Sequence, residues 1–313
     1  MIKSIIILQT RNHCMLRSEL KQLTLFALPP AKQGVVNVAS VPQRSPFRYP
    51  GGKTWLVPTI RRWLKSLEWK PEYFLEPFAG GAIVGLTVAF EKLAEKVILV
   101  ELDDQVSAVW KTILSEDGEW LARAILTFDL TMANVREELA KPATSIRKKA
   151  FQTILKNRTY HGGILAPGSG LIKHGENGKG IHSRWYPATL AKRIRAISSI
   201  RDKIIFVEGD GLTVLQKYAS TKKKAVFIDP PYTAGGKKAG QRLYTHFQVD
   251  HNLLFTIASK MAGDVLLTYD TAKEVLELAK SHNFQNALVP MKNTHHTQMS
   301  ELLIGKKLQW LSL

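Results

Sequence analysis

The sequence is poor in cysteine and acidic residues, and it has no long hydrophobic run. Its one cysteine, Cys14, cannot form a disulfide within the chain and leaves no cysteine-rich metal framework. The early apolar run Ile5-Ile6-Ile7-Leu8 is far too short to span a bilayer, and polar residues follow it where a signal peptide needs small ones. We therefore expect a cytoplasmic protein without a secretion signal or a membrane anchor.

The shortage of acidic residues leaves a large positive charge. Lysine and arginine total 44 against 26 aspartates and glutamates, which gives a formal charge of +18. Lysine and arginine side chains that neutralise phosphates release condensed counterions, and this release favours binding to nucleic acid. A solvated basic surface without a partner is the alternative, but the charge balance favours a nucleic-acid partner.

Apolar segments that end in acidic residues recur along the chain. The segments at 73–76 and 96–100 are separated by a glycine-rich turn and an apolar helix, and Glu101 follows the second. Strand, glycine-rich turn, helix, strand and acid is the order of a doubly wound nucleotide-binding unit. Further strands are expected near 204–208, 225–229, 265–270 and 301–304. The sequence therefore predicts an α/β, Rossmann-like sheet.

The rhythm of strands and helices is interrupted in the middle of the chain. Residues 112–200 begin with helical patterns and continue into a loop rich in glycine, histidine and arginine. We predict an inserted, mainly helical region at 112–200, a catalytic domain formed by 46–111 and 201–313, and an N-terminal extension over residues 1–45.

The tetrapeptide Asp229-Pro230-Pro231-Tyr232 follows an apolar strand candidate and carries chemistry suited to adenine. The N6 atom of adenine is a poor nucleophile because its lone pair is delocalised into the ring. The Asp229 carboxylate and the Pro230 carbonyl could accept both N6 hydrogens, and Tyr232 could stack on a base extruded from the duplex. An ordinary turn at the end of a strand is the competing interpretation.

Other motifs stand in order before this one. They are Tyr49-Pro50-Gly51-Gly52-Lys53, Glu76-Pro77-Phe78-Ala79-Gly80 and the strand-ending Glu101. Together with Asp229-Pro230-Pro231-Tyr232 they resemble, over roughly residues 46–305, the Dam-like D12 class of N6-adenine-specific DNA methyltransferases. The resemblance implies a Rossmann-like fold, an inserted target-recognition domain, S-adenosylmethionine as cofactor, double-stranded DNA as substrate, and a prokaryotic or phage-infected cell. It leaves open a cognate restriction endonuclease as a partner.

The resemblance also assigns roles to individual residues. The catalytic residues would be Asp229, Pro230 and Tyr232. Tyr49 and Lys53 would contact the methionine end of the cofactor, and Glu101 would hold its ribose hydroxyls. The full set expected to bind the cofactor is Tyr49, Gly51, Gly52, Lys53, Glu76, Phe78, Gly80, Gly81, Glu101, Asp210 and Asp229. For Asp210, capping of the following helix is an equally weighted alternative.

Basic residues of the insertion are interleaved with aromatic ones, which suits phosphate neutralisation beside stacking surfaces. The expected DNA contacts in the insertion are Arg147, Lys148, Lys156, Asn157, Arg158 and Arg184. A loop after the catalytic motif adds Lys237, Lys238 and Arg242. The histidines lack the cysteine or acid spacing of a metal site, so no metal is expected.

Several alternatives stay open. A cytosine-C5 enzyme needs a cysteine nucleophile, and Cys14 precedes every motif, so that class is excluded. Methylation of cytosine N4 uses the same direct transfer but usually has serine where Asp229 stands. Methylation of RNA adenine, and a catalytically silent DNA-binding module of the same fold, are the remaining alternatives.

Overall fold

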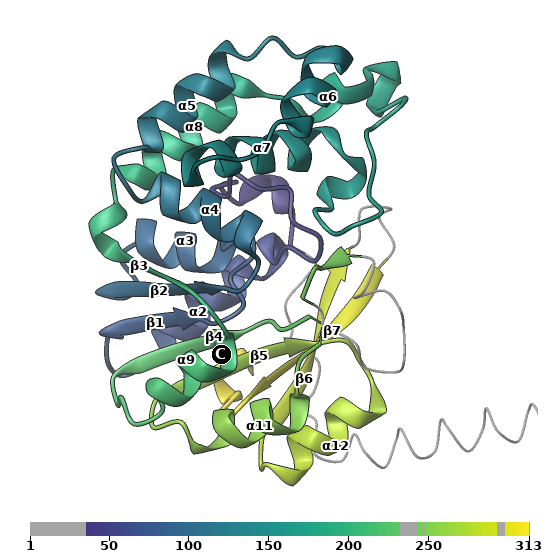
Figure 1. The fold of residues 1–313 in the computed structure, drawn as a ribbon. Helices are drawn as coiled ribbons and strands as arrows, with labels where there is room; N and C mark the ends of the chain where they lie inside the picture. Colours follow the sequence, from purple (N-terminus) through teal and green to yellow (C-terminus); the bar gives the residue numbers. More distant parts are fainter. Residues whose placement is uncertain (1–35, 232–242, 247, 293–297, 313) are drawn as a thin grey trace, which may run out of the picture.

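A seven-stranded sheet with helices on both faces organises the protein (Figure 1). The computed structural model describes residues 36–231, 243–246, 248–292 and 298–312. The strands are β1 Tyr73–Glu76, β2 Lys96–Glu101, β3 Ile204–Glu208, β4 Lys224–Ile228, β5 Asp264–Tyr269, β6 Gln285–Lys292 and β7 Gln298–Gly305. The predicted Rossmann-like α/β class is therefore confirmed.

The strand order is β3-β2-β1-β4-β5-β7-β6. Strands β1 to β5 are parallel, whereas β7 runs antiparallel to β5 and β6 antiparallel to β7. The chain moves outward from β1 to β3 and then returns to the other side of β1 at β4. Open α/β sheets bind ligands at such a switch point, outside the carboxyl ends of the strands.

Strand β6 is not indicated by the sequence. It contains Pro290 and begins with Gln285 and Asn286, and a proline inside an apolar run argues against a strand. In the structure β6 pairs only with β7, at the edge of the sheet, where a missing backbone donor is tolerated. The expected last strand near 301–304 is confirmed as part of β7.

Helices cover both faces of the sheet and also form a layer beyond it. They are α2 Val57–Ser66, α3 Ile83–Phe90, α4 Asp104–Ile113, α5 Gly118–Thr127, α6 Met132–Ala140, α7 Ile146–Thr159, α8 Pro187–Ser198, α9 Gly211–Lys217, α11 His251–Lys260 and α12 Lys273–Ser281. Short 3₁₀ helices lie at η2 Val38–Ser40, η3 Thr54–Leu56, η4 His161–Gly163, η5 Glu176–Gly178, η6 Gly180–Arg184, η7 Arg201–Lys203 and η9 Gln309–Ser312. Within the described ranges, every helix is too short or too polar to cross a membrane.

Successive strand residues bury their side chains on opposite faces, as a two-residue period requires. Phe74, Leu99 and Phe227 pack in the core that includes side chains of α2, α3 and α4. Leu75, Ile98 and Val226 pack in the core shared with α9 and α11. Because both faces are apolar, the central strands read as continuous hydrophobic runs.

Helices α5 to α8 lie between α4 and β3 in the chain and form the upper part of Figure 1. Helix α7 packs along α4, and α5 packs along α8. Ile154 of α7 and Ile194 of α8 belong to the same buried cluster as Trp110 of α4. The helical region thus continues the core of one sheet face. Val41, within the expected N-terminal extension, is also buried there.

A matched pair of isoleucines tests the two-sided burial of the sheet. Ile98 and Ile205 pair directly across β2 and β3, but Ile98 is 0% exposed and Ile205 is 38% exposed. We expect Ile98→Ala to lower the free energy of unfolding by about 2–5 kcal/mol through the lost burial and the cavity left behind. Ile205→Ala should cost clearly less. Urea denaturation of both variants gives the comparison, and equal losses would contradict the assigned burial.

Candidate active site

Acidic side chains collect at the carboxyl edge of the sheet. Glu76 ends β1, Glu101 ends β2, and Asp229 follows β4. Because β1 lies between β2 and β4, these three residues flank the switch point of the sheet. Lys53 reaches the same edge from the segment that precedes η3. The topology therefore brings together motif residues that are up to 176 positions apart in the sequence (229 − 53).

Two donors from different elements hold the Asp229 carboxylate. Its Oδ1 atom accepts a hydrogen bond of 2.8 Å from Thr268 Oγ1 and lies 3.0 Å from Lys53 Nζ. Thr268 is buried on β5, opposite Asp229 in the parallel register. The carboxylate is thereby fixed at the point where the chain enters the rigid Pro230-Pro231 turn. Tyr232, the last residue of this motif, lies outside the described residues.

Lys53 is buried between two carboxylates and one carbonyl group. Its Nζ lies 3.0 Å from Asp229 Oδ1 and 3.5 Å from Glu301 Oε2, and it donates to the Gly51 carbonyl at 3.0 Å. Burial by itself lowers the pKa of Lys53, but the two carboxylates outweigh it and raise the pKa overall. Lys53 therefore carries its positive charge inside the site.

Glu301 is a site residue that the motifs did not reveal. It lies on β7 one residue before Leu302, which pairs with Tyr269 at the end of β5, and this register places it at the active edge. Burial raises the pKa of the Glu301 carboxyl to about 7, although Lys53 opposes the shift. In the sequence, the only signal was an acid at the start of an apolar run.

The Glu101 carboxylate is fixed by backbone donors on two sides. Oε2 accepts from Gly80 N at 2.8 Å, and Oε1 accepts from Leu102 N and Asp103 N, each at 2.9 Å. Burial raises the pKa of Glu101 to about 7 despite these hydrogen bonds. A carboxylate offers about four acceptor positions, so Glu101 can accept from a ligand as well.

A glycine turn separates Glu101 from Tyr49. Gly80 has φ +46°, and a Cβ atom there would lie 2.5 Å from Cε1 of Tyr49. On the other side, Trp110 Nε1 donates to the Gly80 carbonyl at 3.0 Å. A Cβ atom on Gly81 would come within 3.0 Å of Tyr49 Cβ. The turn therefore requires glycine, because the Tyr49 side chain packs directly against its backbone.

Tyr244 completes the aromatic side of the site. Its ring centroid lies 5.9 Å from that of Tyr49, and its hydroxyl donates to the Pro50 carbonyl at 3.1 Å. Gly51, with φ +73°, lies against this hydroxyl, and the neighbouring Gly52 N donates to the Tyr49 carbonyl at 3.2 Å, which closes the turn. A cavity of about 20 Å³ lies beside the two tyrosine rings. This volume is small beside the several hundred Å³ of a typical ligand pocket.

The remaining expected cofactor residues take supporting positions. Glu76 is buried, and its Oε2 accepts from Gly85 N in α3 at 2.8 Å, so it ties β1 to that helix. Asp210 caps α9 by accepting from Thr213 N at 2.8 Å and is exposed. Phe78 lies against the start of α9, since a Cβ atom on Gly211 would be 3.2 Å from its ring. The structure thus brings Phe78 and Asp210 together.

Several expected DNA contacts are engaged within the protein. Asn157 is fully buried, accepts from Arg48 N at 2.9 Å and donates to the Arg48 carbonyl at 2.9 Å. The side-chain amide of Asn157 is thus hydrogen-bonded to the backbone, and in this arrangement it cannot make the expected contact with DNA. Arg147 pairs with an aspartate, Lys148 with Glu138, and Lys156 donates to the Leu165 carbonyl.

Two of the expected contacts lie next to the segment that leads into Tyr49. Arg158 is buried at the end of α7 and donates to the Pro46 carbonyl. Arg184 ends η6. Lys237, Lys238 and Arg242 lie outside the described residues.

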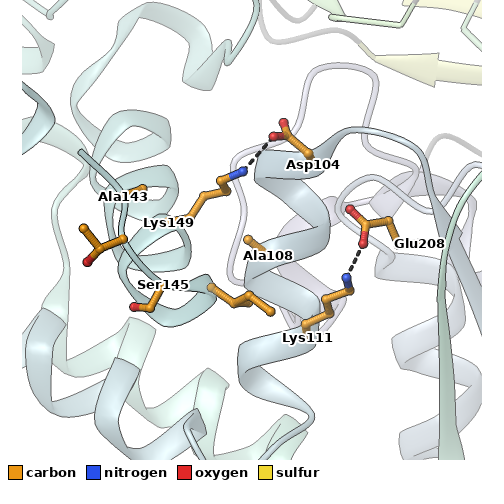
Figure 2. Close-up of a pocket in the computed structure, with 9 residues that line it drawn as sticks. Asp104, Ala108, Lys111, Ala143, Ser145, Lys149 and Glu208 are labelled. Carbon is orange, nitrogen blue, oxygen red and sulfur yellow. Dashed lines mark hydrogen bonds and ion pairs between the residues drawn. The ribbon is translucent and has the colours of Figure 1, made fainter. Parts of the chain in front are cut away.

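An open pocket of about 220 Å³ lies apart from these motifs, between α4 and the start of α7 (Figure 2). Lys149 Nζ pairs with Asp104 Oδ2 at 2.8 Å, and Lys111 pairs with Glu208. Its charges are thus neutralised locally, and none of the motif residues lines it, so we do not place the active site there. The described ranges contain no group of three metal-binding side chains.

Glu301→Gln tests the buried carboxylate through the pH dependence of stability. The pKa of Glu301 is about 7 in the folded protein against the usual 4.5, so the folded state retains a proton that the unfolded state releases. This group therefore lowers stability as the pH rises from about 4.5 to 7, by about 3 kcal/mol at full ionisation. In Glu301→Gln that loss disappears, and the shares of the other buried carboxyls, Glu76 and Glu101 among them, remain.

Urea denaturation of wild type and variant at pH 4.5, 6 and 7.5 measures the difference. The variant should become more stable relative to wild type as the pH rises. Glu274→Gln, which removes a carboxylate from the exposed surface of α12, serves as the control and should follow the wild-type curve. A Glu301→Gln curve parallel to wild type would refute the assigned burial.

Comparisons with known proteins relate the chain to solved structures and to a protein family. Two solved structures similar to the chain are an rRNA methyltransferase, aviRa, from Streptomyces viridochromogenes and a candidate RNA methyltransferase from Pyrococcus horikoshii. The first is 14% identical, over 88% of this chain and 96% of that one, with a TM-score of 0.39. The second is 11% identical, over 84% and 87% respectively, with a TM-score of 0.37. Neither similarity is close enough to carry an inference about substrate.

No curated protein sequence matches the chain. The family model of the D12 class N6 adenine-specific DNA methyltransferases matches residues 49–295, most of the chain, and spans all the motifs described above. The chain belongs to the D12 class N6 adenine-specific DNA methyltransferase family.

Proposed function

We propose that the protein transfers a methyl group from S-adenosylmethionine to N6 of an adenine flipped out of double-stranded DNA. The observation that carries this proposal is the Asp229 carboxylate, which Thr268 and Lys53 hold at the end of β4 beside the rigid Pro230. An acceptor of fixed direction at this edge is what activation of an exocyclic amine requires.

Asp229 and the Pro230 carbonyl would accept the two N6 hydrogens and draw the nitrogen toward tetrahedral geometry. The nitrogen lone pair would then point away from the ring system and could attack directly, with no covalent enzyme intermediate. S-adenosylmethionine, when bound, supplies the electrophilic methyl group. The proton that N6 loses would pass to the Asp229 carboxylate, which is already hydrogen-bonded to it. Tyr232 would stack on the flipped base.

The residues around the switch point fit the cofactor by their chemistry. Glu101 faces the glycine turn and can accept from the vicinal hydroxyls of a ribose. Gly80 and Gly81 carry no side chain that would hold a ligand away from the backbone. Tyr49 and Lys53 are proposed to contact the methionine end of the cofactor. Phe78 and Asp210, which lie together at the start of α9, are proposed for the cofactor's adenine.

The helical region formed by residues 112–200 is proposed to read the DNA. It lies beyond the α4 side of the sheet (Figure 1), and Asn157 and Arg158 of α7 contact Arg48 and Pro46, just before Tyr49. The net charge of +18 supports an extended phosphate partner. Cytosine N4 or RNA adenine as substrate, and a catalytically silent module, are outcomes that the following experiments would detect.

Asp229→Ala is expected to abolish methyl transfer while DNA binding persists, because it removes the acceptor for N6 but no phosphate contact. Thr268→Val keeps the shape of the neighbouring side chain and removes only one donor to Asp229, so it should lower kcat partially. Transfer of a radiolabelled methyl group to DNA measures both. Wild-type turnover in Asp229→Ala would eliminate the mechanism.

Expression in a methylation-deficient host tests substrate and base together. Direct sequencing of the host DNA should reveal N6-methyladenine in a defined sequence context with the wild-type protein. The Asp229→Ala protein, expressed at the same level, is the control and should leave the DNA unmodified. N4-methylcytosine instead, or no modified base with a folded protein, would overturn the proposal.

A further inference from the structure

Two groups of basic residues in and beside the helical region differ in their partners. Members of the first group form ion pairs with acidic side chains and are largely neutralised. They are Arg147 with Asp117 at 3.1 Å, Lys149 with Asp104 at 2.8 Å, Arg195 with Glu119 at 2.8 Å and Arg201 with Glu116 at 2.6 Å. A basic residue in such a pair must break it before it can neutralise a phosphate.

The second group consists of Arg48, Arg158 and Arg193, which we call the arginine cluster. Its members come from the segment before Tyr49, the end of α7 and α8. They lie close enough to act on one another: burial, then Arg193, Arg48 and Arg184, lowers the pKa of Arg158 to about 9. Burial and then Arg184 lower the pKa of Arg48.

No carboxylate within the described residues contributes to these shifts of Arg48, Arg158 or Arg193. The guanidinium groups instead donate to neutral carbonyls of one segment. Arg158 donates to the Pro46 carbonyl, and Arg193 Nη1 donates to the Ser45 carbonyl at 3.0 Å. Carbonyl dipoles orient these side chains but do not cancel their charge.

Arg158 shows the cost of this arrangement most clearly. The residue is 6% exposed, and its buried Nε–H has no hydrogen-bond partner among the residues that the structure describes. A buried charge beside like charges, with one donor unsatisfied, is unfavourable unless an anion completes the site. Guanidinium groups match the oxygens of a phosphate in a bidentate manner, so a phosphate diester is the anion that this cluster fits.

We propose that the arginine cluster binds a backbone phosphate of the DNA strand that carries the target adenine. This inference rests on the proposed function, because that function supplies the duplex. The position of the cluster supports it: the carbonyls that Arg193 and Arg158 hold belong to Ser45 and Pro46, immediately before the segment Tyr49 to Lys53 that reaches Asp229. A phosphate bound there lies next to the active site.

The test is duplex binding measured by fluorescence anisotropy, without methyl donor, over a range of salt concentrations. Arg193→Ala is the main variant because Arg193 is only half-buried and can be replaced with less risk to folding than Arg158. Arg195→Ala is the matched control, since it removes the same charge from the same helix but from a residue paired with Glu119. Circular dichroism confirms that both variants fold.

Arg193→Ala should weaken binding about tenfold near 0.1 M salt and reduce the slope of log K against log salt by about 0.9, the value of one lost phosphate contact. Arg48→Ala should act in the same direction. Arg195→Ala should change the affinity less than about twofold. Arg193→Lys keeps the charge and should retain the slope while losing part of the affinity.

Equal affinity and slope for wild type and Arg193→Ala would overturn the proposal and leave the cluster a structural clamp. A competition with inorganic phosphate at constant ionic strength separates the two phosphate sources. Micromolar binding of inorganic phosphate in calorimetry that is lost in Arg193→Ala, with no effect of the phosphate on duplex binding, would identify a free-anion site and also overturn it. Methylation by the wild-type protein reports on the proposed function separately, because the binding slopes are measured without methyl donor.

Discussion

The buried ammonium of Lys53 is the interaction on which the active edge depends. A charge inside a protein is costly unless opposite charges and hydrogen bonds compensate it, and here the compensation comes from two carboxylates and one carbonyl. Asp229 follows β4, Glu301 lies on β7, and Lys53 precedes the first long helix. The lysine therefore fixes the relative positions of three segments that are distant in the chain. The two carboxylates would repel each other, but they can lie close together because the lysine lies between them.

The mixed sheet makes this arrangement possible. Five parallel strands point their carboxyl ends to one edge, which accounts for Glu76, Glu101 and Asp229. A sixth parallel strand would bring only its last residue to this edge. The antiparallel β7 instead begins at that edge and brings Glu301, a residue inside the strand, close to it. The strand directions that create the ligand crevice therefore also place Glu301 beside Lys53 as a counter-charge. Thr268 of β5 completes the support by donating to Asp229.

The local sequence pattern predicted the site residues that lie at the ends of strands. Each apolar strand ended in an acid, and because parallel strands end at one edge, Glu101 and Asp229 could be expected to lie near each other. Glu301 could not be placed in this way, because its position depends on the antiparallel register of Tyr269 with Leu302. The basic insertion was visible as composition, but the ion pairs that some of its basic residues form were not. The pairing of Arg195 with Glu119 arises from the packing of α8 on α5, which no short sequence window contains.

The segment from Ser45 to Lys53 connects the two halves of the proposed chemistry. Its first residues are held by Arg193 and Arg158, Asn157 holds both backbone polar groups of Arg48, and its last residue reaches Asp229. A phosphate on the arginine cluster would therefore act on a segment whose backbone is hydrogen-bonded at Ser45, at Pro46 and at Arg48, the residue before Tyr49. If DNA changes the affinity for the methyl donor through this segment, then the donor must change the affinity for DNA by the same factor. Because Tyr49 covers the glycine turn, a ligand at that turn and a phosphate that acts on this segment would both affect the same side chain.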